Sequence, residues 1–409
     1  MFDIRPFKGT RPYSVEAENL IAPSTDHLTE EGIIDIFEKS YWNYLKILNP
    51  VGKTKEKESL KAAKKHFSEM KTNNIIKKDI KSCFYIYQIK TSTHIQIGFL
   101  AIANIEMFIK NNIKGHELTY EKRTQERADQ MLNLDTQIGP IYLFYEDYSE
   151  LDDLLFQHTF KESNYDFMSF DNSRHTLWCI DDSIEIDELY NSINKLKIFY
   201  IADGHHRISA IKKIYEYKSS KNYKNNSINE YKHFMFSAFP KSKTKIYDYN
   251  RVVRDLNSLS VKNFLDKIEK NFIYSTSSTP VKPKKNREFG MYHDNKWYLL
   301  KFKNEKIINN DILSKLDINI LNNFCLKPVL GIQNLNNDER IRFIAGSHGL
   351  KALEKKVNDN PDSVAFSIFA TEIDSVIEVA NNKLTMPPKS TWFDPKPLDG
   401  LVVYEFNQK

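Results

Sequence analysis

The five-residue sequence Asp-Gly-His-His-Arg that begins at Asp203 combines side chains that could bind a phosphate and transfer a proton. Gly204 lacks a side chain, so the backbone can approach a ligand closely there. Arg207 offers a planar set of donors suited to phosphate oxygens, and His205 and His206 add further donors that can also exchange protons. Asp203 could hold Mg²⁺ or accept the proton of a hydroxyl group.

The elements on either side of this sequence should place it at a strand-to-helix turn. An apolar run at residues 197–202 predicts a strand, and residues 208–217 predict a helix. The first turn of a helix has N–H groups without intrahelical acceptors and lies at the positive end of the helix dipole. The position therefore favours an anion such as phosphate. The structural alternative is a capped helix in which the aspartate bonds the first turn and the histidines are partly buried.

A second group of candidate residues, His116 and Glu117, precedes Thr119 and a predicted helix at residues 119–134. Both follow a strand, so they could project into the same cleft as Asp203, with Glu117 as a base or metal ligand. We take Asp203, Glu117 and His116 as candidate catalytic residues. A polar surface position is the alternative for the last two.

A third group lies in the proline-containing segment at residues 386–396. Proline fixes the backbone, and Lys389, Ser390 and Thr391 could complete a phosphate or substrate site. The alternative is a rigid surface connection. Arg251 could add a cation to the cleft, although a salt-bridged structural arginine is the favoured interpretation.

Composition limits the classes of protein that the chain can belong to. Its 409 residues are 41% hydrophobic and 13% aromatic, enough for a large core and a second, smaller unit. No run approaches the roughly 20 apolar residues of a membrane span, and the N-terminus lacks the features of a secretory signal, so we expect a soluble, cytoplasmic protein. The net charge of +5 comes from lysines spread along the chain, which argues against nucleic-acid binding.

The order of predicted elements indicates an α/β fold with a mixed sheet. Residues 275–287 have the composition of a linker, which predicts a catalytic domain at residues 1–274 and a smaller α/β lobe at residues 288–409. Further elements are expected as strands at residues 83–87, 95–103, 141–145, 176–180, 233–239, 245–249 and 363–369, helices at 184–196, 261–271, 311–324 and 372–381, and a hairpin at 291–297.

The chain resembles the bacterial and archaeal family called domain of unknown function 1015. The resemblance extends over nearly the whole chain and leaves the reaction open. It rests on these segments: residues 4–9 (Ile-Arg-Pro-Phe-Lys-Gly), Ala22 and Pro23 with Asp26, His116 and Glu117 with Thr119, Gly139 and Pro140, residues 174–178, 200–207 and 249–253, and residues 386–391.

The turn at residues 203–207 is also similar to the phosphate-binding loop of the ParB and sulfiredoxin superfamily, which includes free serine kinases. This resemblance implies that Gly204 to Arg207 hold the phosphates of ATP or ADP, and that Asp203 or Glu117 orients Mg²⁺ or removes the hydroxyl proton. It implies a ParB/sulfiredoxin-like domain that phosphorylates serine or a similar small hydroxyl compound.

The same superfamily contains nucleotide-binding DNA-partition proteins, so the alternative is a nucleotide-binding regulator without metabolic turnover. A DNA-partition protein should carry a helix-turn-helix domain with a basic recognition helix, and the sequence after Asp255 shows no convincing one. Repair of oxidised thiols is disfavoured because His205 stands where that chemistry needs a cysteine. We therefore expect a small molecule and a nucleotide as partners.

Overall fold

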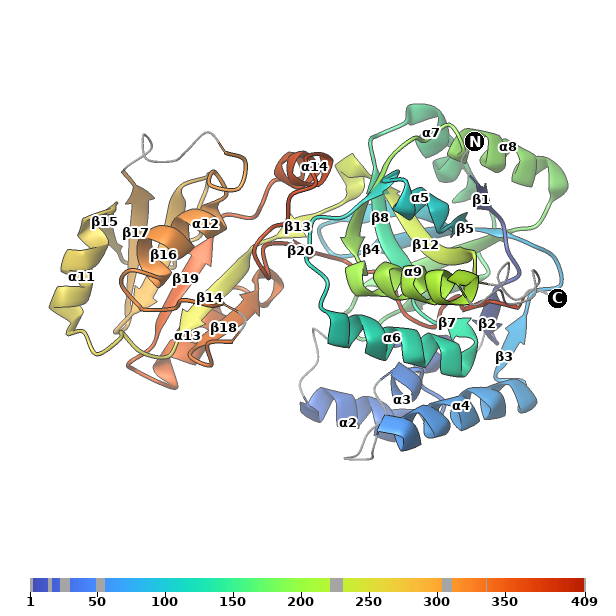
Figure 1. Ribbon diagram of the computed structural model, residues 1–409, viewed down its shortest axis with the longest axis horizontal. Coiled ribbons are helices and arrows are strands. Elements are labelled where there is room, and N and C mark those ends of the chain that lie inside the picture. Colours follow the sequence, from blue (N-terminus) through green and yellow to red (C-terminus); the bar gives the residue numbers. More distant parts are fainter. Residues whose placement is uncertain are drawn as a thin grey trace. The chain divides into compact units, whose positions relative to one another are not determined.

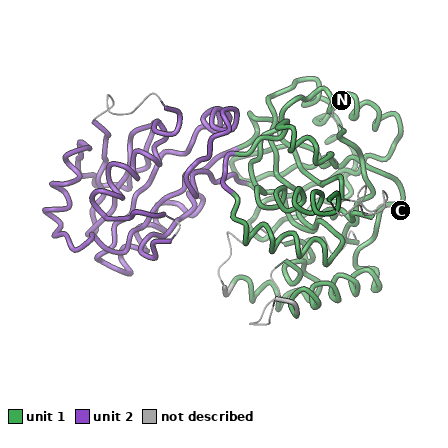
Figure 2. The backbone as a smooth tube through the Cα atoms, in the orientation of Figure 1, with its two compact units in different colours: residues 1–115, 119–244, 395–409 green, residues 116–118, 245–394 purple. Residues whose placement is uncertain are grey.

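The computed structural model describes residues 3–13, 17–22, 30–48, 56–220, 231–303, 311–335 and 337–407. Pro23 and Asp26 of the family resemblance lie outside these residues. The fold is mixed α/β, and the chain forms two compact units (Figure 2). Unit 1 consists of Met1–Gly115, Thr119–Thr244 and Pro395–Lys409, and unit 2 consists of His116–Leu118 and Lys245–Asp394.

The boundaries between the two units do not fall in the expected linker at residues 275–287. Phe272–Ser277 forms strand β15, and residues 278–287 connect β15 to β16 within one sheet of unit 2. This proline- and lysine-rich segment therefore connects two strands of one sheet and does not link two domains. The expected C-terminal lobe at residues 288–409 is also wrong at its end, because residues 395–409 belong to unit 1. There β21 (Tyr404–Glu405) pairs with β7 (Thr136–Gln137).

Unit 1 contains a large mixed sheet in the order β6-β11-β8-β12-β5-β4-β10-β9, with β1 paired to β5. The expected pairing of residues 83–87 with 95–103 is confirmed as the antiparallel pair β4 and β5. Every residue of β8 is buried, as expected for an apolar run in the middle of a sheet. The strands are β1 (Ile4–Arg5), β4 (Phe84–Lys90), β5 (Ile95–Asn104), β6 (Ile113–Lys114), β8 (Ile141–Tyr145), β9 (Tyr165–Met168), β10 (Arg174–Ile180), β11 (Phe199–Asp203) and β12 (His233–Pro240).

The helices of unit 1 include two that contact each other beside the predicted phosphate turn, α6 and α9 (Figure 1). The expected helix at 119–134 is confirmed as α6, whereas α9 begins three residues before the expected start at residue 208. The helices are α1 (Ala17–Leu20), α2 (Glu30–Lys39), α3 (Leu45–Leu48), α4 (Glu56–Thr72), α5 (Glu106–Ile109), α6 (Glu121–Leu134), α7 (Ser149–His158), α8 (Ser183–Ile193), α9 (His205–Ser220) and the 3₁₀ turn Lys241–Lys243. A small sheet pairs β2 (Thr10–Pro12) with β3 (Ile76–Lys78).

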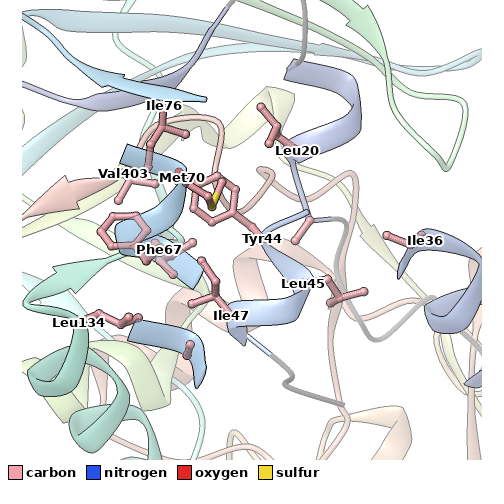
Figure 3. Packing of buried hydrophobic residues seen from close by; sticks show 13 residues of the cluster. Leu20, Ile36, Tyr44, Leu45, Ile47, Phe67, Met70, Ile76, Leu134 and Val403 are labelled. Carbon is pink, nitrogen blue, oxygen red and sulfur yellow. The ribbon is translucent and has the colours of Figure 1, made fainter. Parts of the chain in front are cut away.

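A cluster of buried apolar side chains packs helices α2, α3 and α4 against α6 and the C-terminal segment. Figure 3 shows Tyr44 of the loop before α3 among Phe67 and Met70 of α4 and Val403 of the C-terminal segment. Leu134 joins the same cluster at the end of α6. The cluster therefore fixes residues near both chain ends against α6.

Unit 2 is built on an antiparallel sheet in the order β15-β17-β16-β19-β14-β18. The expected hairpin is confirmed as β16 and β17, and Asp294 and Asn295 in its turn have φ of 50° and 57°, as a two-residue hairpin turn requires. Outside this sheet, β13 (Ile246–Tyr247) pairs with β20 (Trp392–Phe393). The other elements of unit 2 are β14 (Tyr249–Val253), α11 (Val261–Glu269), β15 (Phe272–Ser277), β16 (Glu288–His293), β17 (Lys296–Phe302), α12 (Asp317–Leu321), the π-helical turn Asn322–Leu326, β18 (Ile341–Ala345), the 3₁₀ turn Gly346–His348, α13 (Leu350–Asn358), β19 (Val364–Ile368) and α14 (Ile373–Asn381).

In the described part of the chain, no helix is both long enough and apolar enough to cross a lipid bilayer.

We predict that Phe67→Ala lowers the free energy of unfolding by about 3–5 kcal/mol, because it removes a buried ring from the cluster that joins α4 to the C-terminal segment. Urea unfolding would measure this loss. Lys64→Ala, at an exposed position of the same helix, is the control and should change stability by less than about 0.5 kcal/mol. Equal effects of the two substitutions would contradict the packing described here.

Candidate phosphate site

Asp203 lies at the carboxyl end of β11, where the strand pairing becomes irregular. Ile201 lies opposite Leu143 of β8, but Asp203 lies opposite Tyr142, so one residue of β11 is left out of the register. Such an irregularity bends a strand and redirects the side chains that follow it. Gly204 comes next with φ of +102°, a conformation that residues with a side chain rarely adopt. The expected strand-to-helix turn is therefore present.

The side chain of Asp203 forms an ion pair with each of two cations. One carboxylate oxygen accepts a hydrogen bond from Arg207, in the first turn of α9, and the other lies 3.2 Å from Nζ of Lys396. Arg207 in turn donates to the Pro140 carbonyl at 2.6 Å and lies 3.4 Å from a carboxylate oxygen of Asp399. The turn, the residues around Pro140 and the C-terminal segment thus meet in one charged cluster.

The two carboxyl groups of this cluster have opposite pKa shifts. Burial opposes ionisation of Asp203, but the charges of Lys396 and Arg207 outweigh it and hold the pKa of Asp203 below its usual range. Burial raises the pKa of Asp399, and Arg207 and Arg127 offset only part of that rise. Asp203 therefore stays ionised, and Asp399 is the stronger base of the two.

The close approach of Arg207 and Asp399 depends on Gly139. A Cβ atom at Gly139 would lie 1.9 Å from a carboxylate oxygen of Asp399 and 2.8 Å from Nη1 of Arg207. The backbone around Asp399 is itself fixed, because Asp399 exchanges two hydrogen bonds with Ala22. Any side chain at residue 139 would therefore displace the ion pair.

The two histidines of the turn lie in different surroundings. His205 is 5% exposed, and burial lowers its pKa to about 4, so the ring is neutral at physiological pH. His206 stacks on Tyr120 with ring centroids 6.1 Å apart, and its Nε2 accepts a hydrogen bond from the Tyr120 backbone at 3.1 Å. Nε2 is therefore occupied by the Tyr120 backbone, and a phosphate contact of the His206 ring stays a prediction.

His116 and Glu117 belong to unit 2. His116 is 1% exposed, and its Nε2 lies 3.2 Å from the hydroxyl of Thr391. Its carbonyl accepts a hydrogen bond from Met386 at 2.8 Å, whereas Glu117 is exposed. The structure therefore joins the second and third groups of candidate residues through His116 and Thr391. A shared cleft with Asp203 stays a prediction.

Arg251 and the neighbouring candidates are also in unit 2, and one expectation about them is wrong. Arg251 was expected to be salt-bridged, but it is 1% exposed and pairs with no carboxylate among the described residues. It donates instead to the backbone carbonyls of Tyr249 and Lys389. The hydroxyl of Ser390 donates to the Pro387 carbonyl at 2.6 Å, so this side chain braces its own loop.

Sequence reasoning did not assign Asp399 or Arg127 to the site, and it gave Lys396 no role at the turn. Arg127 lies in the expected helix α6 and acts electrostatically on Asp203 and Asp399. The run Lys-Pro-Leu-Asp-Gly that begins at Lys396 places charges beside Pro and Gly, which is a weak sign of a fixed functional loop. Nothing in the sequence shows that this run returns to the first unit.

Comparison with known proteins gives one family match. A family model described as a protein of unknown function (DUF1015) matches residues 4–319. No curated protein matches the chain.

Among solved structures, the chain is similar to SbnI from Staphylococcus aureus with a C-terminal truncation, at 10% identity over 73% of this chain and 85% of that one, with a TM-score of 0.39. It is similar to a free serine kinase variant in complex with ADP, at 11% identity over 72% and 87% of the two chains, with a TM-score of 0.36. It is also similar to a conserved hypothetical protein from Pyrococcus furiosus, at 12% identity over 72% and 90%, with a TM-score of 0.33.

We predict that His205 makes the protein less stable as the pH falls from 6.5 to 4. The unfolded chain binds a proton at His205 near pH 6.5, whereas the folded chain binds it only near pH 4, so protonation favours unfolding in that interval. His205→Gln should remove about 3 kcal/mol of this pH dependence, which urea unfolding at several pH values would measure. Parallel pH profiles for the two proteins would contradict the burial of a neutral His205.

Proposed function

The chain belongs to the family of proteins of unknown function called DUF1015, and we propose that it is a nucleotide-dependent phosphotransferase that acts on a small hydroxyl compound. The observation that carries the proposal is the charged cluster around Asp203 at the start of α9. The acceptor that we propose, free serine, follows from the resemblance of the turn to the phosphate loop of free serine kinases. ATP or ADP would be the donor.

The start of α9 supports phosphate binding through two independent features. A helix of this length presents N–H groups and a positive dipole end to a ligand at its first turn. Arg207 and Lys396 add two cationic side chains that are 21% and 12% exposed, so they are partly shielded from water and interact strongly with an anion. In the proposed complex, one of these side chains turns from Asp203 toward the phosphates.

The two carboxylates of the cluster support the proposal that Mg²⁺ binds together with the phosphates. Asp203 and Asp399 influence each other electrostatically, and Mg²⁺ in phosphate sites is typically held by one or two carboxylates together with phosphate oxygens. Asp203 is the ligand that we propose, with Lys396 or Arg207 moving from one of its oxygens to a phosphate. The ion would neutralise charge on the phosphate chain.

The pKa shifts suggest how the two carboxylates divide their roles. In the proposed reaction the acceptor hydroxyl oxygen forms a bond to the terminal phosphorus, the bond from that phosphorus to the bridging oxygen breaks, and the hydroxyl proton passes to a carboxylate. Asp203 is a weak base because its cations lower its pKa, whereas burial makes Asp399 a stronger one. We therefore propose Asp399 as the proton acceptor, with Glu117 as the alternative.

The test is an assay for phosphoserine with purified protein, Mg²⁺, serine and either ATP or ADP. We expect phosphoserine with one nucleotide, and a loss of at least about a hundredfold in Arg207→Ala, because that variant lacks a cation that stabilises the transferring phosphoryl group. Asp203→Ala should be similarly impaired. Glu216→Ala, on an exposed position of the same helix, should retain activity.

The remaining outcomes of this assay decide between the proposal and its alternative. Nucleotide binding that depends on Arg207 without product formation would favour a nucleotide-binding regulator. Near-normal activity in Arg207→Ala would overturn the assignment of this turn.

A further inference from the structure

Arg251 occupies an unusual position for a permanently charged side chain. It lies in the middle of β14, an inner strand of the unit 2 sheet, where it pairs with Phe343 of β18 on one side and Phe366 of β19 on the other. It is among the largest fully buried side chains described. Moving a charge away from water is costly unless a partner of opposite charge compensates.

The hydrogen-bond partners of Arg251 are neutral and incomplete. Its guanidinium donates to the backbone carbonyls of Tyr249 and Lys389, the latter at 2.9 Å. Its Nε atom is buried and has no hydrogen-bond partner in the described structure. The carboxylate of Asp248, three residues earlier in the chain, binds other groups, Asn250 at 2.6 Å and Lys282 at 3.8 Å. The positive charge of Arg251 therefore has no anionic partner among the described residues.

A second cation reaches the same aromatic ring as Arg251. The guanidinium lies 5.9 Å from the ring centroid of Tyr249 and 5.1 Å from that of Phe343. The ammonium group of Lys389 lies 5.6 Å from the Tyr249 centroid. Aromatic faces stabilise single cations modestly, and they do not neutralise two. The pair concentrates positive charge at one place.

The segment that carries Lys389 is held by hydrogen bonds at both ends. Met386 donates to the His116 carbonyl at 2.8 Å, and the hydroxyl of Thr371 donates to the Ser390 carbonyl at 2.9 Å. Lys389 itself has φ of 58°, a left-handed conformation that lysine seldom adopts. Its carbonyl thereby reaches Arg251 while its side chain remains exposed.

From this arrangement we propose that Arg251 and Lys389 form an oxyanion site of unit 2 that takes a phosphate group. The exposed ammonium group of Lys389 binds the anion first. Because Arg251 is 1% exposed, contact with its Nε requires the Lys389 segment to open, and the anion then takes the place of the Lys389 carbonyl. A guanidinium and an ammonium together match the two charges of phosphate better than the single charge of a carboxylate.

The pKa of Arg251 agrees with a missing anion. Burial lowers it to about 9, and Tyr249 opposes this shift without cancelling it. The guanidinium is still charged at neutral pH, so an anion would find a cation that is already desolvated.

The experiment measures binding of radiolabelled inorganic phosphate to the full chain by equilibrium dialysis, with Lys389→Asn as the main variant. Asparagine tolerates the left-handed conformation, so the substitution removes the charge with little strain. Lys383→Asn is a matched control, because Lys383 is also an exposed lysine of unit 2 with φ of 54°. Arg207→Ala separates this site from the cluster at Asp203.

We expect Lys389→Asn to weaken phosphate binding at the Arg251 site about tenfold or more. Binding at this site should persist in Arg207→Ala and should be unchanged in Lys383→Asn. Arg251→Lys should weaken binding at the same site. Unchanged binding in Lys389→Asn would overturn the inference, and so would equal losses in the two asparagine variants, which would indicate a general effect of charge. Loss of phosphate binding in Arg207→Ala alone would support the cluster at Asp203 and overturn the site at Arg251.

Discussion

The ionised carboxylate of Asp203 between Arg207 and Lys396 is the interaction on which the organisation of unit 1 around its candidate site depends. It joins the end of β11 and the first turn of α9 to a segment that lies 193 residues further along the chain. Lys396 is part of the C-terminal segment that returns to unit 1, and its charge helps to keep the partly buried carboxylate ionised. The glycine at residue 139 leaves room for the adjoining pair of Arg207 and Asp399, and the apolar cluster below α6 keeps these segments in place.

The parts of the fold that sequence patterns predicted are those with a strong local signal. Apolar runs identified the inner strands β8 and β11, and a charged stretch without Pro or Gly identified α6. The strand-to-helix turn at Asp203 was predictable because Asp-Gly-His-His-Arg lies between an apolar run and a helical pattern. The same reasoning placed the start of α9 too late, since it assigned the histidines to the turn, whereas the structure includes them in the helix.

The parts that the sequence did not predict depend on contacts between distant residues. A proline- and lysine-rich stretch has the same composition whether it connects two domains or two strands, so residues 278–287 were misassigned. The return of Pro395–Lys409 to unit 1 is set by the pairing of β21 with β7 and by burial of Val403. Neither leaves a local pattern, and Lys396 and Asp399 were therefore not placed beside Asp203.

Arg207 in unit 1 and Arg251 in unit 2 differ in their exposure and in their partners, and both differences affect how an anion could reach them. Arg207 is partly exposed and already bound to carboxylates, so a ligand must compete with them but can reach it readily. Arg251 has no carboxylate among the described residues, but it is covered by its own strand and the Lys389 segment. In the two proposed sites, an anion should therefore bind at Arg207 quickly, and at Arg251 only as fast as the Lys389 segment opens.

The most direct test of the account is the affinity for Mg²⁺–ADP measured by isothermal titration calorimetry in Lys396→Gln. If the turn and the C-terminal segment form one phosphate site, this variant should bind about tenfold more weakly or worse, because a charge-assisted contact is lost. Lys195→Gln, which removes an exposed ion pair with Glu150 and a cation–π contact with Tyr148, should bind as the unsubstituted protein does. Equal affinity in Lys396→Gln and the unsubstituted protein would contradict the claim that Lys396 belongs to the site.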